Sequence, residues 1–250
     1  MRPKTKQEIE IMRSGGRLLA TILDKLEKEI SPGISTKDLA DIARTMLKKL
    51  GGQPAFLGHE NFPDVMTVSI NEEIVHAIPS PKKIIQEGDV VGLDFGVIYK
   101  GLYTDGARTV YVGQKPPADI YRLLDSSQKA LYAGIDAIKG DGTRVGDVSS
   151  AVQAVLDKAK LGIIRDLVGH GVGDDIHESP NIPNYGVAGT GVALSAGMTI
   201  CIEPMASLGD WQIKTADDKW TVVMADGSLS AHFEHTVLVT EKGAEILTTL

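Results

Sequence analysis

The chain carries an internal repeat, which is the feature that most restricts its fold. Residues 33–39 resemble residues 142–148, and residues 88–94 resemble residues 197–203, so both pairs share an offset of 109 residues. This period is far too long for a solenoid of short stacked repeats. We therefore predict one domain over residues 1–250, built from pseudo-symmetric halves of about 1–112 and 113–250 that face each other around a pseudo-twofold axis.

Each half begins with two predicted helices. Apolar residues near helical spacing predict helices at about 6–30 and 36–50, and again at about 118–139 and 145–160. Ser35 and Asp38 have the spacing of a capping box at the start of the second helix. Hairpins outnumber strand–helix–strand units in the remainder. The expected fold class is α/β (α+β), with a central, mostly antiparallel sheet and helices outside.

Carboxylates occur beside the apolar runs of the predicted strands. Asp94 and Glu203 each follow such a run, and Glu234 precedes one. An ionised carboxylate among apolar side chains is costly unless a positive charge compensates it. Lysine and arginine are scarce in these runs, so we expect bound metal to supply that charge.

Asp105 is the fourth carboxylate, 11 residues after Asp94. The intervening residues 97–103 read as two short strands around a Lys-Gly turn. A symmetric hairpin would place the two aspartates opposite each other, where like charges destabilise unless they share a cation or a proton. Glu234 corresponds to Asp105 if the second hairpin is 20 residues longer. The alternative is a pair of surface acids beside a turn.

Three histidines have settings that favour a functional role. His170 lies in a Gly-His-Gly-Val-Gly segment, where the glycines allow close approach of other chain segments; His177 follows, and His76 precedes an Ala-Ile-Pro sequence. A lone histidine is usually a structural residue, but three histidines in such settings favour a functional role. His59, His232 and His235 are less informative, and strand alternation turns His235 away from the ligand side. We expect Cys201 to be a small core residue.

Several function classes are excluded by the sequence. Asp94-Phe95-Gly96 also occurs in kinases, but the remaining kinase motifs are missing. The glycine-rich segment lacks the spacing of a dinucleotide fingerprint, and no zincin helix motif is present. A net charge of −7 argues against a general nucleic-acid binder. One cysteine and no long apolar stretch favour a reducing compartment and a cytoplasmic protein without a membrane span.

Taken together, these motifs resemble those of the type I methionine aminopeptidases, in the creatinase/prolidase ("pita-bread") superfamily. The resemblance covers the whole chain and depends on His76 to Pro79, Asp94 with Asp105, Gly169 to Gly173, Ile202 to Met205, and Ser230 to Thr236. It implies a pita-bread fold and a single catalytic domain. All five metal-ligand positions of the family are filled.

The resemblance also implies roles for individual residues. Asp105 and Glu234 would bridge two divalent metal ions (cobalt, manganese, iron or zinc). Asp94 would complete the ligand set of one ion, and His170 and Glu203 would complete that of the other. Glu203 would carry the proton, while His76 and His177 would act in catalysis and substrate binding. Phe56, His59, Phe62, Thr67 and Trp220 would line the methionine pocket.

The implied activity is removal of the N-terminal initiator methionine from nascent proteins when the second residue is small, by water activated at the dinuclear site. The implied partners are nascent peptides and, transiently, the ribosome, with no nucleic-acid specificity and no membrane; we expect a monomer. Departures from the family pattern are Ala77 and Gly106, together with Thr67, His59 and Ile176, which occupy positions around the implied methionine pocket. The alternatives are a proline-specific relative and a non-catalytic binding member of the superfamily.

Overall fold

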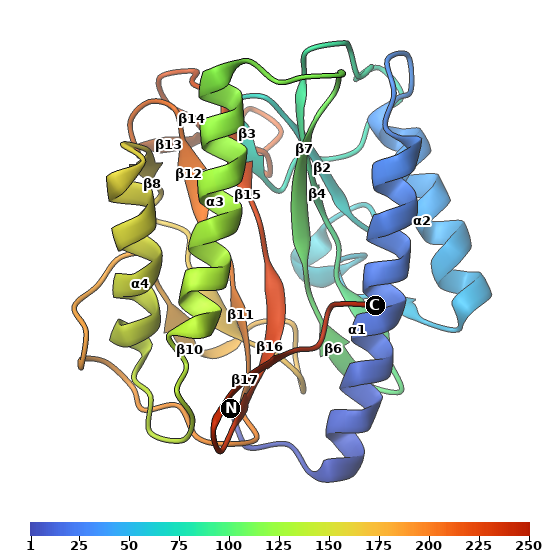
Figure 1. Ribbon diagram of the computed structural model, residues 1–250. Coiled ribbons are helices and arrows are strands. Elements are labelled where there is room, and N and C mark those ends of the chain that lie inside the picture. Colours follow the sequence, from blue (N-terminus) through green and yellow to red (C-terminus); the bar gives the residue numbers. More distant parts are fainter.

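The computed structural model describes residues 1–250, with two helices in each half of the chain. They are α1 (Lys6–Glu29), α2 (Thr36–Leu50), α3 (Ala118–Asp136) and α4 (Val145–Lys158). Figure 1 shows α1 and α2 on one side of the molecule, α3 and α4 on the other, and strands behind and between them. The four predicted helices are confirmed, with ends shifted by at most a few residues.

Side-chain caps fix where the first two helices begin. Thr5 and Glu8 form a capping box at α1, and Ser35 and Asp38 form the predicted one at α2. In the latter, Ser35 Oγ accepts from Asp38 N–H at 3.1 Å, and Asp38 accepts from Ser35 N–H at 3.0 Å. Each reciprocal pair satisfies two backbone donors that a helix start leaves without partners.

The strands form small sheets in which every pairing is antiparallel. In the first half, β2 (Thr67–Ile70), β4 (Val90–Asp94) and β7 (Ala107–Tyr111) form one sheet. In the second half the sheet order is β10 (Glu178–Ile182), β9 (Gly169–Gly171), β11 (Thr199–Ile202), β16 (His235–Thr240) and β17 (Gly243–Ile246).

Three smaller sheets complete the fold. They are β1 (Gln53–Pro54), β5 (Val97–Tyr99) and β6 (Leu102–Thr104); β15 (Ser230–His232), β12 (Met205–Ser207) and β8 (Gly162–Ile163); and β13 (Ile213–Thr215), β14 (Val222–Met224) and β3 (Glu73–Val75). A short 3₁₀ helix, η1, covers His59–Asn61. None of the helices is long and apolar enough to cross a membrane.

The two halves join where β7 meets residues 232–234, between the end of β15 and the start of β16. Ala107 N–H donates to Glu234 O at 3.4 Å, and Glu234 N–H donates to Ala107 O at 2.9 Å. Two residues along, Thr109 Oγ1 lies between the strands: it donates to His232 O at 2.6 Å and accepts from His232 N–H at 2.9 Å. The sheets of the two halves are thus continuous through backbone and threonine hydrogen bonds.

Each half has its own hydrophobic core. One cluster of 18 buried residues lies between Leu18 and Val112, and another of 20 lies between Leu123 and Val239. Apolar faces of α1 and α2 pack on strands of the first half, and those of α3 and α4 pack mainly on strands of the second. Burial of these faces is the main stabilising term for both halves.

The predicted turn between the two aspartates is confirmed, but the predicted register is wrong. Lys100 and Gly101 both have positive φ, at 49° and 83°, as the tight turn of a two-residue hairpin requires. The register pairs Asp94 with Ala107, two residues beyond Asp105. Asp94 and Asp105 are therefore diagonal neighbours across the hairpin and do not face each other directly.

Candidate metal centre and substrate pocket

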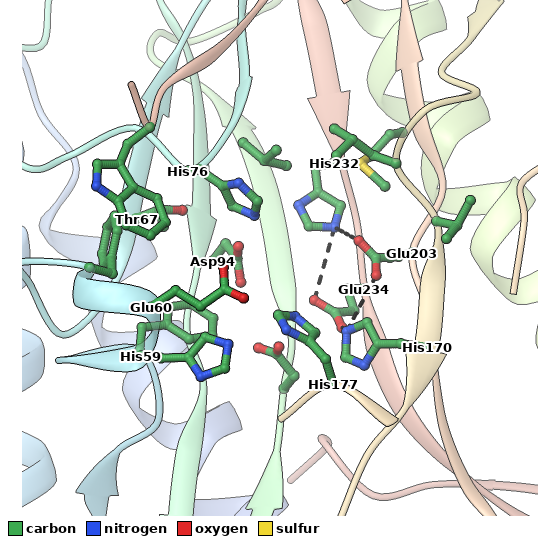
Figure 2. A pocket seen from close by; sticks show the side chains of 18 of the residues that line it. His59, Glu60, Thr67, His76, Asp94, His170, His177, Glu203, His232 and Glu234 are labelled. Carbon is green, nitrogen blue, oxygen red and sulfur yellow. Dashed lines mark ion pairs between the residues drawn. The ribbon is translucent and has the colours of Figure 1, made fainter. Parts of the chain in front are cut away.

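The five predicted ligands converge at one end of a pocket whose cavity has a volume of about 280 Å³. Asp94 ends β4, Asp105 follows β6, His170 lies in β9, Glu203 follows β11 and Glu234 precedes β16. All five are buried. Figure 2 shows Asp94 on one side of the pocket and His170, Glu203 and Glu234 on the other, so both halves of the chain contribute.

Distances between the side chains are those of a metal-ligand cluster. Carboxylate oxygens of Asp94, Asp105 and Glu234 lie within 4.8 Å of one another. His170 Nε2 lies 3.4 Å from Glu203 Oε1 and 3.9 Å from Glu234 Oε1. Glu234 therefore belongs to both groups and lies between them.

None of the four carboxylates forms an ion pair with lysine or arginine, and neither residue type lines the pocket. Asp94 Oδ1 and Glu234 Oε1 are buried without a hydrogen-bond partner. Buried polar atoms are otherwise almost always paired. Orphaned oxygens within a cluster of carboxylates fit the ligand set of divalent cations.

The same environment raises the pKa values of the carboxyl groups. Burial, then the nearby charge of Glu203, raises the pKa of Asp105 to about 7. Burial raises the pKa of Glu203 to about 7, although neighbouring His170 opposes the shift. Burial and the other carboxylates also raise the pKa values of Asp94 and Glu234 well above their usual range. Without a cation, the site therefore retains protons.

His170 presents a free Nε2 to the carboxylates. Its Nδ1 lies 3.0 Å from Gly171 O, so the proton is on Nδ1 and Nε2 presents a lone pair toward Glu203 and Glu234. Burial lowers the pKa of this imidazole, which keeps it neutral. A neutral, oriented imidazole is the form that binds metal.

Cys201 also lies within ligand distance of His170 and Glu234. Burial, then the charges of Glu234 and Asp105, raises the pKa of its thiol well above the usual value. The thiolate is the form that binds metal, so this thiol is a poor ligand. It is fully buried among apolar side chains, as predicted for a core residue.

His232 is a buried site residue that the sequence interpretation missed. Its Nε2 lies 3.3 Å from Glu203 Oε2 and 3.9 Å from Glu234 Oε2, and this nitrogen has no hydrogen-bond partner. Burial lowers its pKa to about 3. His235, as predicted, points away from the site and bonds to Thr248 Oγ1 at 2.8 Å.

His76 and His177 line the pocket beside the cluster, with His76 above Asp94 and His177 next to His170 in Figure 2. His76 follows β3 with φ at 60°, a conformation that is uncommon and strained for a residue other than glycine. The His177 ring packs edge-on against that of His170, with centroids 4.5 Å apart. Burial lowers the pKa values of His76 and His177 to about 4. Both imidazoles are therefore neutral near pH 7.

The rest of the pocket is largely apolar and aromatic. Phe62 and Trp220 meet edge to face, with centroids 5.2 Å apart and an interplanar angle of 79°. All five predicted pocket residues line the cavity: Phe56, His59, Phe62, Thr67 and Trp220. It is also lined by residues that were not predicted: Glu60, Val75, Leu167, Val168, Asn181 and Met205.

Not every departure from the family pattern affects the cavity. Thr67 and His59 line it, whereas Ile176 is fully buried and does not. The expectation that Ile176 borders the pocket is therefore wrong. Gly106 and Ala77 are also absent from the lining. A β-carbon at Gly106 would lie 3.1 Å from Leu19 and 3.5 Å from Glu234 O, so the space there is limited.

Comparison with known proteins assigns the chain to a family. Residues 10–241 match the model of metallopeptidase family M24. The chain is 42% identical to methionine aminopeptidase 1 of Bacillus subtilis, over 98% of both chains. It is also 42% identical to methionine aminopeptidase A of a Synechocystis species, over 98% of this chain and 96% of that one.

Solved structures give the same result for the fold. The methionine aminopeptidase of Thermotoga maritima superposes with a TM-score of 0.97, at 45% identity and full coverage of both chains. The prolidase of Pyrococcus furiosus has a TM-score of 0.79 at 26% identity, over 99% of this chain but 65% of that one. The predicted pita-bread fold is confirmed. The chain belongs to metallopeptidase family M24, on its methionine aminopeptidase branch.

Proposed function

We propose that this chain removes the initiator methionine from the N-terminus of nascent proteins when the second residue is small. One observation carries the proposal: four buried carboxylates and a neutral histidine converge, without lysine or arginine, beside an aromatic pocket of about 280 Å³. This arrangement supports hydrolytic chemistry next to a cavity for an apolar side chain. The likeness to methionine aminopeptidases over nearly the whole chain supports the same function.

We propose two divalent cations, cobalt, manganese, iron or zinc, as cofactors. Asp105 and Glu234 would bridge them, with Asp94 completing one shell and His170 and Glu203 the other. The shared position of Glu234 between the two groups of ligand atoms supports this division. When bound, such ions lower the pKa of water and polarise the carbonyl group of a peptide bond.

The protein side chains position the substrate and move protons. Glu203 would accept a proton from the attacking water and pass it to the leaving amine, since its carboxylate lies within the cluster, with Oε1 3.4 Å from His170 Nε2. His76 and His177, neutral and beside the cluster, would donate hydrogen bonds to the developing oxyanion and the scissile amide.

The methionine side chain would occupy the apolar end of the cavity. Phe62 and Trp220 form an edge-to-face pair there, and Thr67 lies on the wall nearest Asp94, with which it pairs across β2 and β4. Phe56 and His59 complete the wall. An unbranched, polarisable thioether is well suited to an aromatic pocket.

The test is metal-dependent release of methionine from Met-Ala-Ser, with acetyl-Met-Ala-Ser and Xaa-Pro peptides as comparisons. We expect cleavage of the free Met-Ala-Ser peptide after a divalent cation is supplied, and no cleavage of the acetylated one. Preferential cleavage of the Xaa-Pro peptides would favour a proline-specific enzyme instead. Peptide binding without turnover under all metals would favour a binding protein.

We further propose that residues 1–250 act as one catalytic domain of two pseudo-symmetric halves, because both halves supply ligands and each has its own core. A monomer in the cytoplasm, meeting nascent chains at the ribosome, fits this role. The free, buried Cys201 is consistent with a reducing compartment. Sedimentation of the purified protein tests the oligomeric state.

A further inference from the structure

The loop that carries His177, residues 172–177 between β9 and β10, is held by a buried lysine from outside the site. We call this segment the His177 loop. Lys4 is buried, and its Nζ lies 2.8 Å from Asp174 Oδ2 and 3.8 Å from Glu178 Oε1. The ammonium group of Lys4 thus contacts Asp174, within the His177 loop, and Glu178, the residue directly after the loop.

Backbone hydrogen bonds extend this contact through the loop. Glu178 Oε1 accepts from Asp174 N–H at 2.8 Å and from Asp175 N–H at 3.3 Å. Lys4 is itself anchored, since its N–H donates to Gly197 O at 2.8 Å. The charge on Lys4 therefore stabilises a carboxylate that in turn binds the two amides before Ile176 and His177.

The third glycine of the Gly-His-Gly-Val-Gly segment makes room for the lysine. A β-carbon on Gly173 would lie 2.3 Å from Lys4 Cε, and its φ of 145° is unfavourable for other residues. Tyr103 N–H, from the first half of the chain, donates to Gly173 O at 2.9 Å. Close packing at Gly173 thus joins the lysine stem, the loop and the opposite half of the molecule.

We propose that Lys4 is a positioning residue for His177. The inference rests on the proposed function, because it assigns Lys4 an effect on the same hydrolytic reaction. Lys4 acts through Asp174 and Glu178, which fix the course of the loop, and the loop fixes the imidazole against the ring of His170. Removing the charge leaves Asp174 with the half-exposed Arg2, at 2.8 Å, and Glu178 with the N-terminal ammonium group, at 4.0 Å. The loop then loses the one cation that contacts both carboxylates, and with it its preferred path.

The test compares Lys4→Met with Lys6→Met, a control at an exposed lysine two residues away that forms no ion pair. Misplacing a substrate-positioning group by about 1 Å can cost about a hundredfold in rate. We expect Lys4→Met to lower kcat for Met-Ala-Ser about ten- to a hundredfold while metal content stays unchanged. Lys6→Met should match the unaltered protein, and Lys4→Arg should restore most of the rate.

A double-variant comparison separates positioning from a general loss of stability. In a His177→Ala background, Lys4→Met should change kcat less than about twofold, because the group that it positions is gone. An equal loss in both backgrounds, or unaltered kinetics in Lys4→Met, would overturn the proposal. If unaltered protein fails to cleave Met-Ala-Ser with any metal, the proposed function fails first, and the two failures are distinguishable.

Hydrogen exchange gives a readout that does not depend on activity. The amides of Asp174 and Asp175 should exchange faster in Lys4→Met than in Lys6→Met, while those of β11 stay protected. Asp174→Asn serves if Lys4→Met does not fold, since it removes the negative charge that pairs with Lys4 and Arg2 at a half-exposed position. Unchanged exchange together with unchanged kcat in that variant would equally contradict a positioning role.

Discussion

Asp105 and Thr236, from opposite halves of the chain, are joined by two hydrogen bonds. Asp105 N–H donates to Thr236 Oγ1 at 2.8 Å, and Thr236 Oγ1 donates to Asp105 O at 2.8 Å. Thr236 follows Glu234 by two residues, and Glu234 forms the equivalent pair with Ala107. The distance between the two proposed bridging carboxylates is therefore set by the contact between the halves.

Thr236→Val should weaken both folding and metal binding. The change keeps the side-chain shape but leaves buried backbone groups of Asp105 without their partner, which costs about 1–3 kcal/mol. Urea unfolding measures the stability, and calorimetric titration with Mn²⁺ measures the affinity. Thr236→Ser, which keeps the hydroxyl, is the control. Equal stability and affinity in the valine and serine variants would show that the hydroxyl does not set the site.

His76→Ala should lower kcat with no loss of metal. His76 is held in a strained backbone conformation beside the ligand cluster, and loss of one hydrogen bond to a developing oxyanion costs about 10²–10³ in kcat. Peptide cleavage and elemental analysis of the same preparation measure the two quantities. His170→Ala is the comparison, since it should lose metal. Metal loss in His76→Ala would contradict the assignment.

Trp220→Ala should relax selectivity for the first residue. The change removes the aromatic partner of Phe62 and widens the apolar end of the cavity. We expect kcat/KM for Met-Ala-Ser to fall more than that for Phe-Ala-Ser, so the ratio of the two narrows. Trp211→Ala is matched in size but lies outside the cavity, against Arg165. An unchanged ratio in Trp220→Ala would remove this residue from the methionine pocket.

The metal-free protein should lose stability as pH rises through the site's pKa values. Asp105 and Glu203 have pKa values of about 7 in the folded state, against ordinary values of 3.8 and 4.5. Between these limits the folded chain binds more protons than the unfolded chain, so the free energy of unfolding decreases with rising pH. This contribution is fully present below about pH 4 and lost above about pH 7.

Bound cations should remove that loss, because they require ionised carboxylates. Urea unfolding at pH 5 and pH 7.5, with EDTA or with saturating Mn²⁺, measures the effect. We expect the stabilisation by Mn²⁺ to be larger at pH 7.5. The same pH dependence with and without Mn²⁺ would show that these carboxylates do not hold the ion.

Much of the helical layer could be predicted from the sequence because its signals are local. The spacing of apolar residues predicted the four helices, and the Ser35–Asp38 capping box predicted the first residue of α2. Apolar runs ending at Asp94 and Glu203 indicated buried strands that end in carboxylates. These signals depend on neighbours a few residues away, which the sequence shows directly.

The remaining errors concern contacts between distant segments. The two-residue offset between Asp94 and Asp105 depends on how β4 and β7 pair, which hairpin length alone does not fix. The positive φ of Glu60, 47°, places a carboxylate in the cavity from a loop without periodicity. His232 could have been found, since strand alternation places it on the same side as Glu234.

The most direct test of the metal centre is a titration of metal-free protein with Mn²⁺ or Co²⁺, followed by calorimetry and by methionine release from Met-Ala-Ser. We predict that two ions bind per chain, that activity rises with their binding, and that Glu234→Gln loses both. A chain that cleaves Met-Ala-Ser equally well in excess chelator, or that binds no ion while remaining folded, would contradict the account.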